Sequence, residues 1–383
     1  MSFSASLAKK YYLTLKNHLS VKPSEFLLKH QKDFGELTKD LAVQLNGLQK
    51  AQKKLPTWFD NPSILYPPNL NLEQCSSQVT AQYKASLLKG GLSADLTGGF
   101  GIDSYCLAQS FEEHHYVEKD SRLAAIASSN FEVLGATNVR IHQSDGIDWI
   151  LGSEGGFDLI YLDPSRRNEG GRKFLLEDCE PNILRHHKAL LAKSRQVLYK
   201  LSPLIDISSV LNGLGQVKTL HVVAVKNECK EVLVLSEQGY SNSVDIVTVN
   251  FSDDQTQEVF HFSRSEEFAA KADYAGVDKY VYEPNAAILK SGAFNLLSQR
   301  FALSKLHTNT HLYTSSKYLA HWPGRIFELV DEHYTQANII SRNHPLKPAA
   351  IAKKLKLKEG GEHYLLAFRD IEKPKMLFAK RLK

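Results

Sequence analysis

The segment ADLTGGFGIDS, residues 94–104, combines residue types that can bind a ligand in a turn. A β-prone run leads into Gly98, Gly99 and Gly101, and a helical pattern follows. Glycines let the backbone approach a ligand closely, and free N–H groups at the start of a helix can bind it. Glu118, which ends the next β-prone run 17 residues after Gly101, can accept hydrogen bonds from ribose hydroxyls. These residues predict a site for an adenosine-containing ligand.

The spacing of the glycines narrows the class of ligand. A dinucleotide fingerprint needs three glycines in the order G-x-G-x-x-G, and here Ser104 stands at the third position. Asp95, at the end of the strand before the glycines, would instead face the ammonium group of a ligand. We therefore predict an adenosyl cofactor that carries an ammonium group. An ordinary tight turn between a strand and a helix is the alternative.

Asp163 begins a second candidate set, at the end of the fourth β-prone run. Pro164 and Ser165 follow it directly. In an open α/β sheet the ligand crevice lies at the carboxyl ends of the strands, so we expect these residues beside the adenosyl ligand. A turn-forming Asp before a proline is the alternative for Asp163.

Four further residues are expected to face the substrate in the same crevice. Arg166 and Arg167 follow Ser165, and Lys200 and Pro203 lie at the end of the fifth β-prone run. A guanidinium can stack on a base or pair with a phosphate. The alternatives are a salt-bridged loop for the arginines and a simple ion pair with a nearby carboxylate for Lys200.

These side chains are positioned by short β-prone runs that alternate with helical stretches. The runs are residues 93–97, 115–118, 139–142, 157–163 and 196–201. Strands separated by helices predict right-handed crossovers and a parallel sheet. Two more runs, residues 219–225 and 231–236, are joined by five residues, a link too short for a crossover. The predicted fold class is therefore α/β, a parallel sheet with a C-terminal antiparallel hairpin.

Other parts flank this sheet on both sides in the sequence. Residues 1–75 form a predicted helical module, in which apolar residues recur every three to four positions. Four prolines and three asparagines in residues 55–74 predict the loop that ends it. Residues 76–240 hold the predicted sheet, and the remainder mixes strands and helices. Residues 359–361, EGG, are expected to form a turn between a helix and a strand.

Composition excludes several classes of protein. The chain has 383 residues, and its longest apolar runs are far shorter than the ~18–20 residues of a membrane span. Its four cysteines form no CxxC pair, and adjacent histidines point to different faces, so neither a disulfide framework nor a metal site is expected. We expect a cytoplasmic protein without a membrane or metal partner. The sequence carries no signal of its oligomeric state.

The positive charge is concentrated near the C-terminal end. Residues 345–383 contain eleven basic and four acidic residues, a net charge of +7, whereas the whole chain carries +5. A basic face on one terminal part is typical of polyanion binding, because contacts to phosphates release counterions. This pattern favours RNA as a partner, with a solvated surface as the alternative.

The glycine segment resembles the first motif of class I S-adenosylmethionine-dependent methyltransferases. The resemblance implies S-adenosylmethionine as the cofactor. Cofactor contacts are then implied for Asp95, Thr97, Gly98, Gly99, Gly101, Glu118 and Asp145. Of these, Glu118 is similar to the ribose-binding acid of the family, and Asp145 to the residue that contacts the adenine amine. Ser77 and Thr80 resemble positions that close over the cofactor, and a helix cap with a core-edge hydroxyl is their alternative.

A finer resemblance is to a bacterial subgroup of these enzymes, and it covers nearly the whole chain. It rests on LEQCSSQVTAQYKA (72–85), LDPSRR (162–167), KLSPLIDI (200–207), YEPNAAILKSGAF (282–294) and PGR (323–325). The resemblance implies a Rossmann-like catalytic domain over residues 76–240. A ferredoxin-like segment is implied over 241–318, and a basic THUMP-like module over 319–383.

LDPSRR is also similar to the D-P-P-aromatic motif of amino methyltransferases, whose carboxylate and prolyl carbonyl orient the target amine. The resemblance implies a catalytic set of Asp163, Pro164 and Ser165. Ser165 and Arg166 replace the second proline and the aromatic residue, so a guanidinium would have to stack on the base. Together these features predict methylation of a nucleobase amine in tRNA or rRNA. An RNA-binding protein with a non-catalytic methyltransferase fold, and a protein or small-molecule methyltransferase, are the alternatives.

Overall fold

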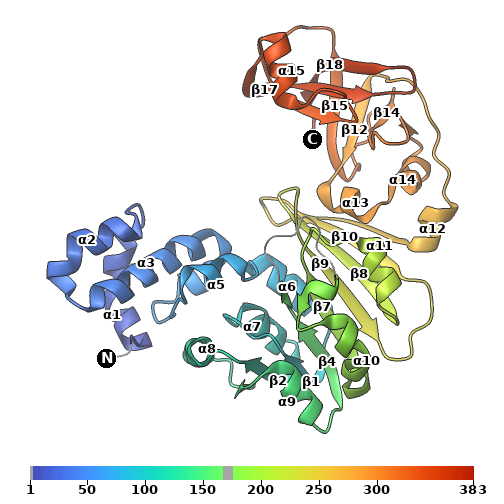
Figure 1. Ribbon diagram of the computed structural model, residues 1–383. Coiled ribbons are helices and arrows are strands. Elements are labelled where there is room, and N and C mark those ends of the chain that lie inside the picture. Colours follow the sequence, from blue (N-terminus) through green and yellow to red (C-terminus); the bar gives the residue numbers. More distant parts are fainter. Residues whose placement is uncertain (1–2, 167–175) are drawn as a thin grey trace. The chain divides into compact units, whose positions relative to one another are not determined.

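The computed structural model describes residues 3–166 and 176–383, and the chain is coloured along its length in Figure 1. It divides into two compact units. The first contains residues 1–201, 208–216 and 234–240. The second contains residues 202–207, 217–233 and 241–383. None of the helices in the described ranges is long and apolar enough to cross a membrane.

Six helices open the first unit. They are α1 (Ala5–Lys16), α2 (Pro23–Phe34), α3 (Leu37–Lys54), α4 (Pro56–Phe59), α5 (Asn69–Gln74) and α6 (Gln78–Ser86). Ser4 caps α1 by accepting a hydrogen bond from the Leu7 N–H, and Pro23 takes the first position of α2, where its missing N–H costs nothing. One face of α3 supplies Leu41, Leu45 and Leu48 to a shared core.

The proline-rich stretch at residues 55–74 is more ordered than the sequence predicts. It contains α4 and α5 rather than a continuous loop. Pro56 is the first residue of α4 and Pro68 directly precedes α5, so two of the prolines start helices. Trp58 and Tyr66 from this stretch are each 2% exposed, so burial of apolar surface fixes its path.

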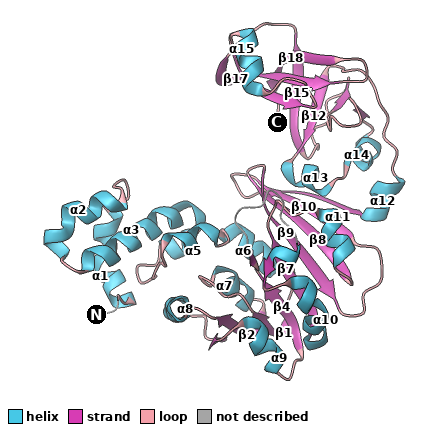
Figure 2. Cartoon of the chain, viewed as in Figure 1, coloured by secondary structure: helices cyan, strands magenta, loops and turns pink. Residues whose placement is uncertain are grey.

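A nine-stranded sheet follows, with the strand order β11-β10-β8-β9-β7-β4-β1-β2-β3. Its strands in the first unit are β1 (Gly90–Asp95), β2 (Phe111–Glu118), β3 (Val139–Gln143), β4 (Phe157–Leu162) and β7 (Ser194–Leu201). These five pair in parallel. Figure 2 draws the strands of this sheet in magenta. The connecting helices are α7 (Ile102–Ala108), α8 (Ser121–Val133), α9 (Gly146–Gly152) and α10 (Ile183–Lys193). The predicted parallel sheet is confirmed.

Short elements complete this part of the chain. They are β5 (Ser165–Arg166), which pairs with β6 (Cys179–Glu180), the 3-10 helix Leu176–Asp178, and α11 (Ile207–Gly213). β5 begins three residues after the carboxyl end of β4, where the Asp163 segment was expected to act, and its pairing brings β6 to the same place.

The predicted hairpin consists of β8 (Val217–Val225) and β9 (Glu228–Glu237), which are neighbours in the sheet. Its turn is only Lys226 and Asn227, with φ angles of 53° and 61°. Two consecutive positive φ angles are typical of a two-residue hairpin turn whose twist matches that of the strands. The strands therefore extend further than the sequence pattern predicts.

Two strands within residues 241–279, where the ferredoxin-like segment was expected to begin, extend this sheet. These residues form β10 (Asp245–Phe251), β11 (Gln257–Ser263) and α12 (Arg264–Ala269). β10 pairs in parallel with β8, and β11 in antiparallel with β10. Ile246, Val249 and Phe251 of β10 are buried, and this burial of apolar surface favours the pairing of β10 with β8.

A second sheet of seven strands forms the C-terminal part of the second unit, in the order β13-β14-β12-β15-β18-β17-β16. The strands are β12 (Tyr280–Pro284), β13 (Ser304–Lys305), β14 (Tyr313–Ser315), β15 (Gly324–Val330), β16 (Gln336–Arg342), β17 (Lys358–Arg369) and β18 (Pro374–Arg381). Its helices are α13 (Ala286–Ser291), α14 (Phe294–Phe301) and α15 (Pro348–Leu355). Val281, Phe327 and Leu366 pack together in one of its cores.

Candidate active site

The glycine turn joins the carboxyl end of β1 to α7. Gly99 and Gly101 have φ angles of 54° and 86°, in the left-handed region that side chains other than glycine rarely adopt. A Cβ at Gly98 would lie 2.3 Å from the Tyr116 ring, and one at Gly101 would lie 2.8 Å from Phe131. The turn therefore needs glycine at all three positions, and it leaves bare backbone facing the carboxyl edge of the sheet.

Thr97 joins the end of β1 to the end of β4. Its Oγ1 donates a hydrogen bond to Asp95 Oδ1 at 3.2 Å and accepts one from the Asp163 N–H at 2.7 Å. β1 and β4 are adjacent parallel strands, so their carboxyl ends meet at one edge. A single threonine thus links the Asp95 carboxylate to the backbone of Asp163.

Asp95 is buried, and its hydrogen-bond partners are neutral. Ser104 Oγ donates to Oδ2 at 2.6 Å, and the Thr97 N–H donates to Oδ1 at 2.9 Å. Burial raises the pKa of Asp95 to about 7, and the hydrogen bonds only partly offset this effect. A cationic group bound next to this carboxylate would favour its ionised form.

Asp103 is also buried near the glycine turn, but unlike Asp95 it has positively charged partners. Its carboxylate is 3.2 Å from Lys84 Nζ and 4.0 Å from Lys200 Nζ, and it accepts hydrogen bonds from Ser76 and Tyr161. Burial alone would raise the pKa of Asp103, but the two ammonium groups and the two hydroxyls hold it below its ordinary value. The two lysines therefore favour the ionised form of Asp103 and compensate its charge.

Asp163 is linked to this network through Lys200. Lys200 Nζ donates a hydrogen bond to Asp163 Oδ2. The Asp163 side chain is 36% exposed and that of Lys200 only 11%, so the carboxylate reaches the surface while its cation lies behind it. Negative and positive charges alternate along a row that runs inward from the sheet edge, from Asp163 through Lys200 and Asp103 to Lys84.

Two further acids lie at the ends of β2 and β3. Glu118 accepts hydrogen bonds from the Gly99 N–H at 2.7 Å and the Asp120 N–H at 2.8 Å, one on each oxygen. A carboxylate oxygen accepts more than one hydrogen bond, so Glu118 can also accept from a diol. Asp145 caps α9 with Oδ1, which accepts from the Ile147 and Asp148 N–H groups.

Most of these residues line two adjoining hollows. The first, of about 150 Å³, is lined by Asp95, Asp103, Tyr161 and the turn from Thr97 to Ile102. The second, of about 240 Å³, is lined by Glu118, Asp145 and Ser165. The hollows share Thr97, Gly99 and Asp163, together with Asn71 and Gln74. Asp163 thus stands where they meet.

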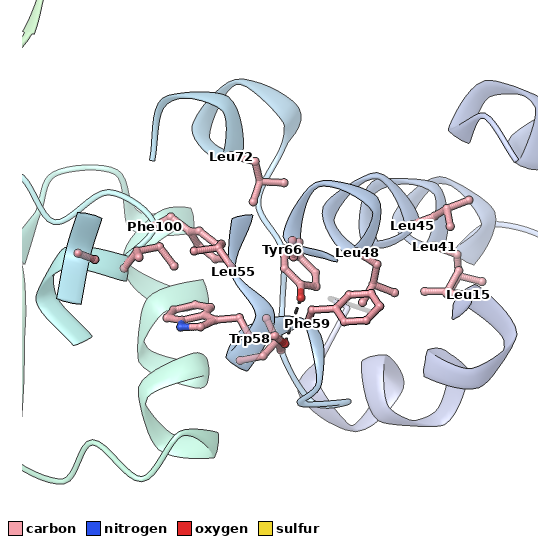
Figure 3. Close-up of a cluster of buried hydrophobic side chains, with 14 of the residues drawn as sticks. Leu15, Leu41, Leu45, Leu48, Leu55, Trp58, Phe59, Tyr66, Leu72 and Phe100 are labelled. Carbon is pink, nitrogen blue, oxygen red and sulfur yellow. Dashed lines mark hydrogen bonds between the residues drawn. The ribbon is translucent and has the colours of Figure 1, made fainter. Parts of the chain in front are cut away.

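The helical N-terminal module takes part in the site, which the sequence did not predict. Asn71, Gln74, Cys75 and Ser76 line the first hollow from α5 and the residues after it. The core of the module also reaches the glycine turn, because Phe100 packs its ring 4.9 Å from that of Trp58, as Figure 3 shows. Deep burial of Phe100, at 3% exposed, therefore anchors the turn from one side.

Several predicted residues lie outside both hollows. Ser77 caps α6 by accepting a hydrogen bond from the Thr80 N–H, and Thr80 Oγ1 donates to the Ser77 carbonyl. These contacts match the helix-cap alternative, and neither residue lines a hollow. Pro164 is buried, and Pro203 belongs to the second unit. Arg166 belongs to β5, and Arg167 lies outside the described residues.

The sequence pattern did not predict the role of Asp103, whose buried carboxylate has Ser76, Tyr161 and Lys84 as partners. Asp103 directly follows the glycine motif, and this position was the available signal. The other three lie 19 to 58 residues from it in sequence, and nothing in a linear pattern pairs residues so far apart. Among residues 3–166 and 176–383, no group of three or more His, Cys, Asp or Glu side chains could hold a metal ion.

An adenosyl cofactor with an ammonium group fits the residues present. The turn offers backbone that no Cβ covers, and Asp95 offers a buried carboxylate with only neutral hydrogen-bond partners. Glu118 and Asp145 stand on the second hollow, where a ribose and an adenine would need acceptors. The donor and acceptor chemistry of the two hollows therefore matches the two halves of S-adenosylmethionine.

Family models match residues 280–323 as a ferredoxin-like domain and residues 325–381 as a THUMP domain-like region. A search of curated protein sequences found no match to the chain.

Among solved structures, the chain is similar to a candidate methyltransferase from Porphyromonas gingivalis W83. The two share 32% sequence identity over 100% of both chains, with a TM-score of 0.87. An rRNA methylase from Streptococcus thermophilus is 15% identical over 41% of this chain and 93% of its own, with a TM-score of 0.31. TrmK of M. capricolum, in complex with S-adenosyl-homocysteine, is 14% identical over 43% and 68%, with a TM-score of 0.33. The last two TM-scores are too low to support a conclusion about this chain.

The full-length match and the two domain matches together identify the chain. It belongs to the family of class I S-adenosylmethionine-dependent methyltransferases that carry a ferredoxin-like domain and a THUMP-like domain.

Proposed function

We propose that this chain transfers a methyl group from S-adenosylmethionine to an amine nitrogen of a nucleobase in tRNA or rRNA. The observation that carries the proposal is the place of Asp163, a partly exposed carboxylate at the junction of the two hollows. A hydrogen-bond acceptor at that point can hold the N–H of a target amine next to the reacting methyl group.

The cofactor, when bound, supplies an electrophilic methyl group on a sulfonium. Asp95 would accept the ammonium group in the first hollow, and Gly98, Gly99 and Gly101 would leave room for the chain that carries it. In the second hollow, Glu118 would accept the ribose hydroxyls and Asp145 the adenine amine. Each role uses an oxygen or a backbone segment that lines one of the two hollows.

Catalysis in this proposal is mostly positioning. Lys200 binds Oδ2 of Asp163 and so orients Oδ1 toward the amine. An amine that donates its hydrogen to Oδ1 would turn its lone pair toward the methyl group that the cofactor supplies. The proton that the nitrogen then loses passes to Asp163 or to water. Pro164 would fix the backbone carbonyl beside it, and Ser165 lines the second hollow.

Two observations favour RNA as the substrate. The chain has a THUMP domain-like region at residues 325–381, a kind of domain associated with RNA. Residues 345–383, which overlap that region, carry a net charge of +7. Contacts to phosphates supply affinity that does not depend on sequence, so a basic domain can hold RNA while the catalytic domain selects the base. Arg166, Arg167, Lys200 and Pro203 remain the proposed contacts to that base.

The decisive experiment measures transfer of labelled methyl groups from S-adenosylmethionine into an extract from cells that lack this protein. The wild type is compared with Asp163→Ala and with Glu154→Ala, an exposed acidic residue outside both hollows. Nuclease-sensitive label that disappears only with Asp163→Ala supports the proposal. Protease-sensitive label would move the substrate to protein, and cofactor binding without any transfer would favour a non-catalytic RNA-binding role.

A further inference from the structure

The C-terminal sheet contains two arginines that share one buried carboxylate. The Glu283 side chain on β12 is only 2% exposed. Its Oε2 accepts a hydrogen bond from Arg325 Nε at 2.6 Å, and its Oε1 accepts from Arg342 Nε at 3.0 Å and from Nη2 at 2.8 Å. Arg325 Nη2 also pairs with Oε2. The acid thus holds both guanidinium planes in a set orientation.

The charges of this cluster do not balance. Two guanidinium groups face one carboxylate, so the cluster carries a net charge of +1. The Arg325 and Arg342 side chains are 24% and 42% exposed, so both reach solvent beside a buried acid. A partly desolvated excess cation is unfavourable unless an anion compensates it. Each guanidinium has five N–H donors, of which Glu283 takes two, so donors remain for a further acceptor.

A hollow lies against the same two arginines. It has a volume of about 410 Å³, and its lining includes Arg325, Arg342, Asn338, Ser341 and Tyr364. The Ser341 hydroxyl already donates to the Leu346 carbonyl, and the Asn338 amide to the Gly361 and His363 carbonyls. The donors that phosphate oxygens need are therefore supplied by the two guanidinium groups. Glu359 is the one acidic residue of this lining, and it is exposed on the strand β17.

A second hollow continues the basic lining. It has a volume of about 460 Å³ and shares Arg325 with the first. Arg381, Lys226 and Lys383 line it as well, although Lys226 pairs with Asp253 and Lys383 with Glu258. All of these residues belong to the second compact unit. A ligand with several phosphates could therefore contact both hollows through Arg325.

We propose that the Arg325–Glu283–Arg342 cluster is a phosphate-binding site for the RNA substrate, with the buried acid orienting both guanidinium groups. This inference rests on the proposed function for the identity of its ligand. The phosphate can belong to the backbone or to a terminal monophosphate, because both present the same oxygens.

The test measures binding of a fluorescent 20-nucleotide RNA of mixed sequence, with and without a 5′-phosphate, over a range of salt concentrations. The variants are Arg342→Gln and Arg325→Gln, with Arg264→Gln on α12 as the matched control, because Arg264 is exposed and lines neither hollow. Removal of one ionic interaction with a phosphate of single-stranded RNA should reduce the slope of log K against log salt by about 0.7. We expect that reduction and at least a severalfold weaker affinity for both site variants only.

The two forms of the RNA separate the sources of the phosphate. If the variants lose affinity equally for both forms, the site binds backbone phosphate. If they lose it only for the 5′-phosphorylated form, the site binds a terminal group. Wild-type affinity and salt slope in both variants, or no RNA binding by the wild type, would overturn the proposal.

A gain of affinity provides a check that misfolding cannot imitate. Glu359→Gln removes the acid of the lining and should strengthen RNA binding, whereas loss of fold can only weaken it.

Methyl transfer distinguishes this inference from the proposed function. If RNA binding depends on the arginines but no transfer occurs, the phosphate site stands and the enzymatic proposal fails. If transfer occurs with an unchanged KM for RNA in Arg342→Gln, the phosphate site fails alone.

Discussion

Asp95 and Asp103 show how neighbouring carboxylates can acquire opposite properties. Both are buried, but Asp103 has two lysine partners and Asp95 has hydroxyl and backbone partners. Burial favours the protonated form unless a cation compensates it. The negative charge of Asp103 is therefore already balanced by lysines of the protein. Asp95 has no such partner and is suited to bind a cationic group of a ligand.

This difference predicts that cofactor binding is linked to a proton. Asp95 has a pKa of about 7 in the folded protein and an ordinary value of 3.8, so the folded state holds the extra proton between these pH values. An ammonium group bound to Asp95 needs the ionised acid, so binding should release the proton below pH 7. Affinity should rise up to tenfold per pH unit toward pH 7 and level off above it.

Isothermal titration in buffers of different ionisation enthalpy would measure the released proton directly. Asp95→Asn should bind the cofactor more weakly and without this pH dependence. Its fold should also lose less stability than the wild type as the pH rises from 4 to 7, because the folded wild-type acid keeps its proton at pH values where the unfolded chain has already lost it. An affinity of the wild type that is constant from pH 5.5 to 8 would contradict this assignment.

At the scale of elements, the N-terminal helices and the glycine turn act as one packed body. Trp58 from α4 packs against Phe100 in the turn and lies 5.9 Å from the Tyr105 ring on α7. Figure 3 shows this packing at the end of a core that continues through Leu55 and Tyr66 to α3. The helical module therefore supports the site, beyond the residues with which it lines the hollows.

Trp58→Ala is expected to lower the free energy of unfolding by ~3–5 kcal/mol, as is usual for truncation of a buried tryptophan. It should also weaken cofactor binding at least tenfold, because Phe100 lies between Gly99 and Gly101 and loses its packing partner. The control is Leu45→Ala, which empties the same core far from the turn. It should reduce stability while the folded protein keeps its cofactor affinity. Equal losses of affinity in the two variants would show that the effect is only one of stability.

At the scale of the whole molecule, basic charge is present at both ends of the sequence. Residues 1–55 contain ten lysines and four acidic residues, a net charge of +6. Together with the +7 of residues 345–383 this exceeds the total of +5, so the part between them is acidic overall. Charge complementarity favours RNA contacts from residues 1–55 and 345–383, and fewer contacts from the acidic part between them.

Replacing the exposed Lys9, Lys10, Lys39 and Lys53 with glutamine tests the N-terminal part of this pattern. RNA affinity should fall, and the salt slope should decrease by about 0.7 for each phosphate of single-stranded RNA that a removed lysine had neutralised. The same four positions changed to arginine keep the charge and should keep the affinity. If the glutamine variant binds RNA as tightly as the arginine variant, the N-terminal lysines are only a solvated surface.

The sequence by itself determined the fold class and the edge of the sheet at which the site lies. Four acids, Asp95, Glu118, Asp145 and Asp163, lie at or just after the end of a strand. The carboxyl ends of parallel strands necessarily meet at one edge. That inference needs only the period of the apolar residues and the order of the elements, both of which are local.

The tertiary structure alone decided which side chains are partners. Lys84 reaches Asp103 across 19 residues, and Asn71 and Gln74 line the hollows from a stretch in which the prolines predicted only a loop. Ser77, expected over the cofactor, caps a helix, while the adjacent Ser76 binds Asp103. Likewise, Gly360 and Gly361 lie inside β17 at a register shift rather than in a turn. Such choices depend on packing between distant segments, and no local pattern records that packing.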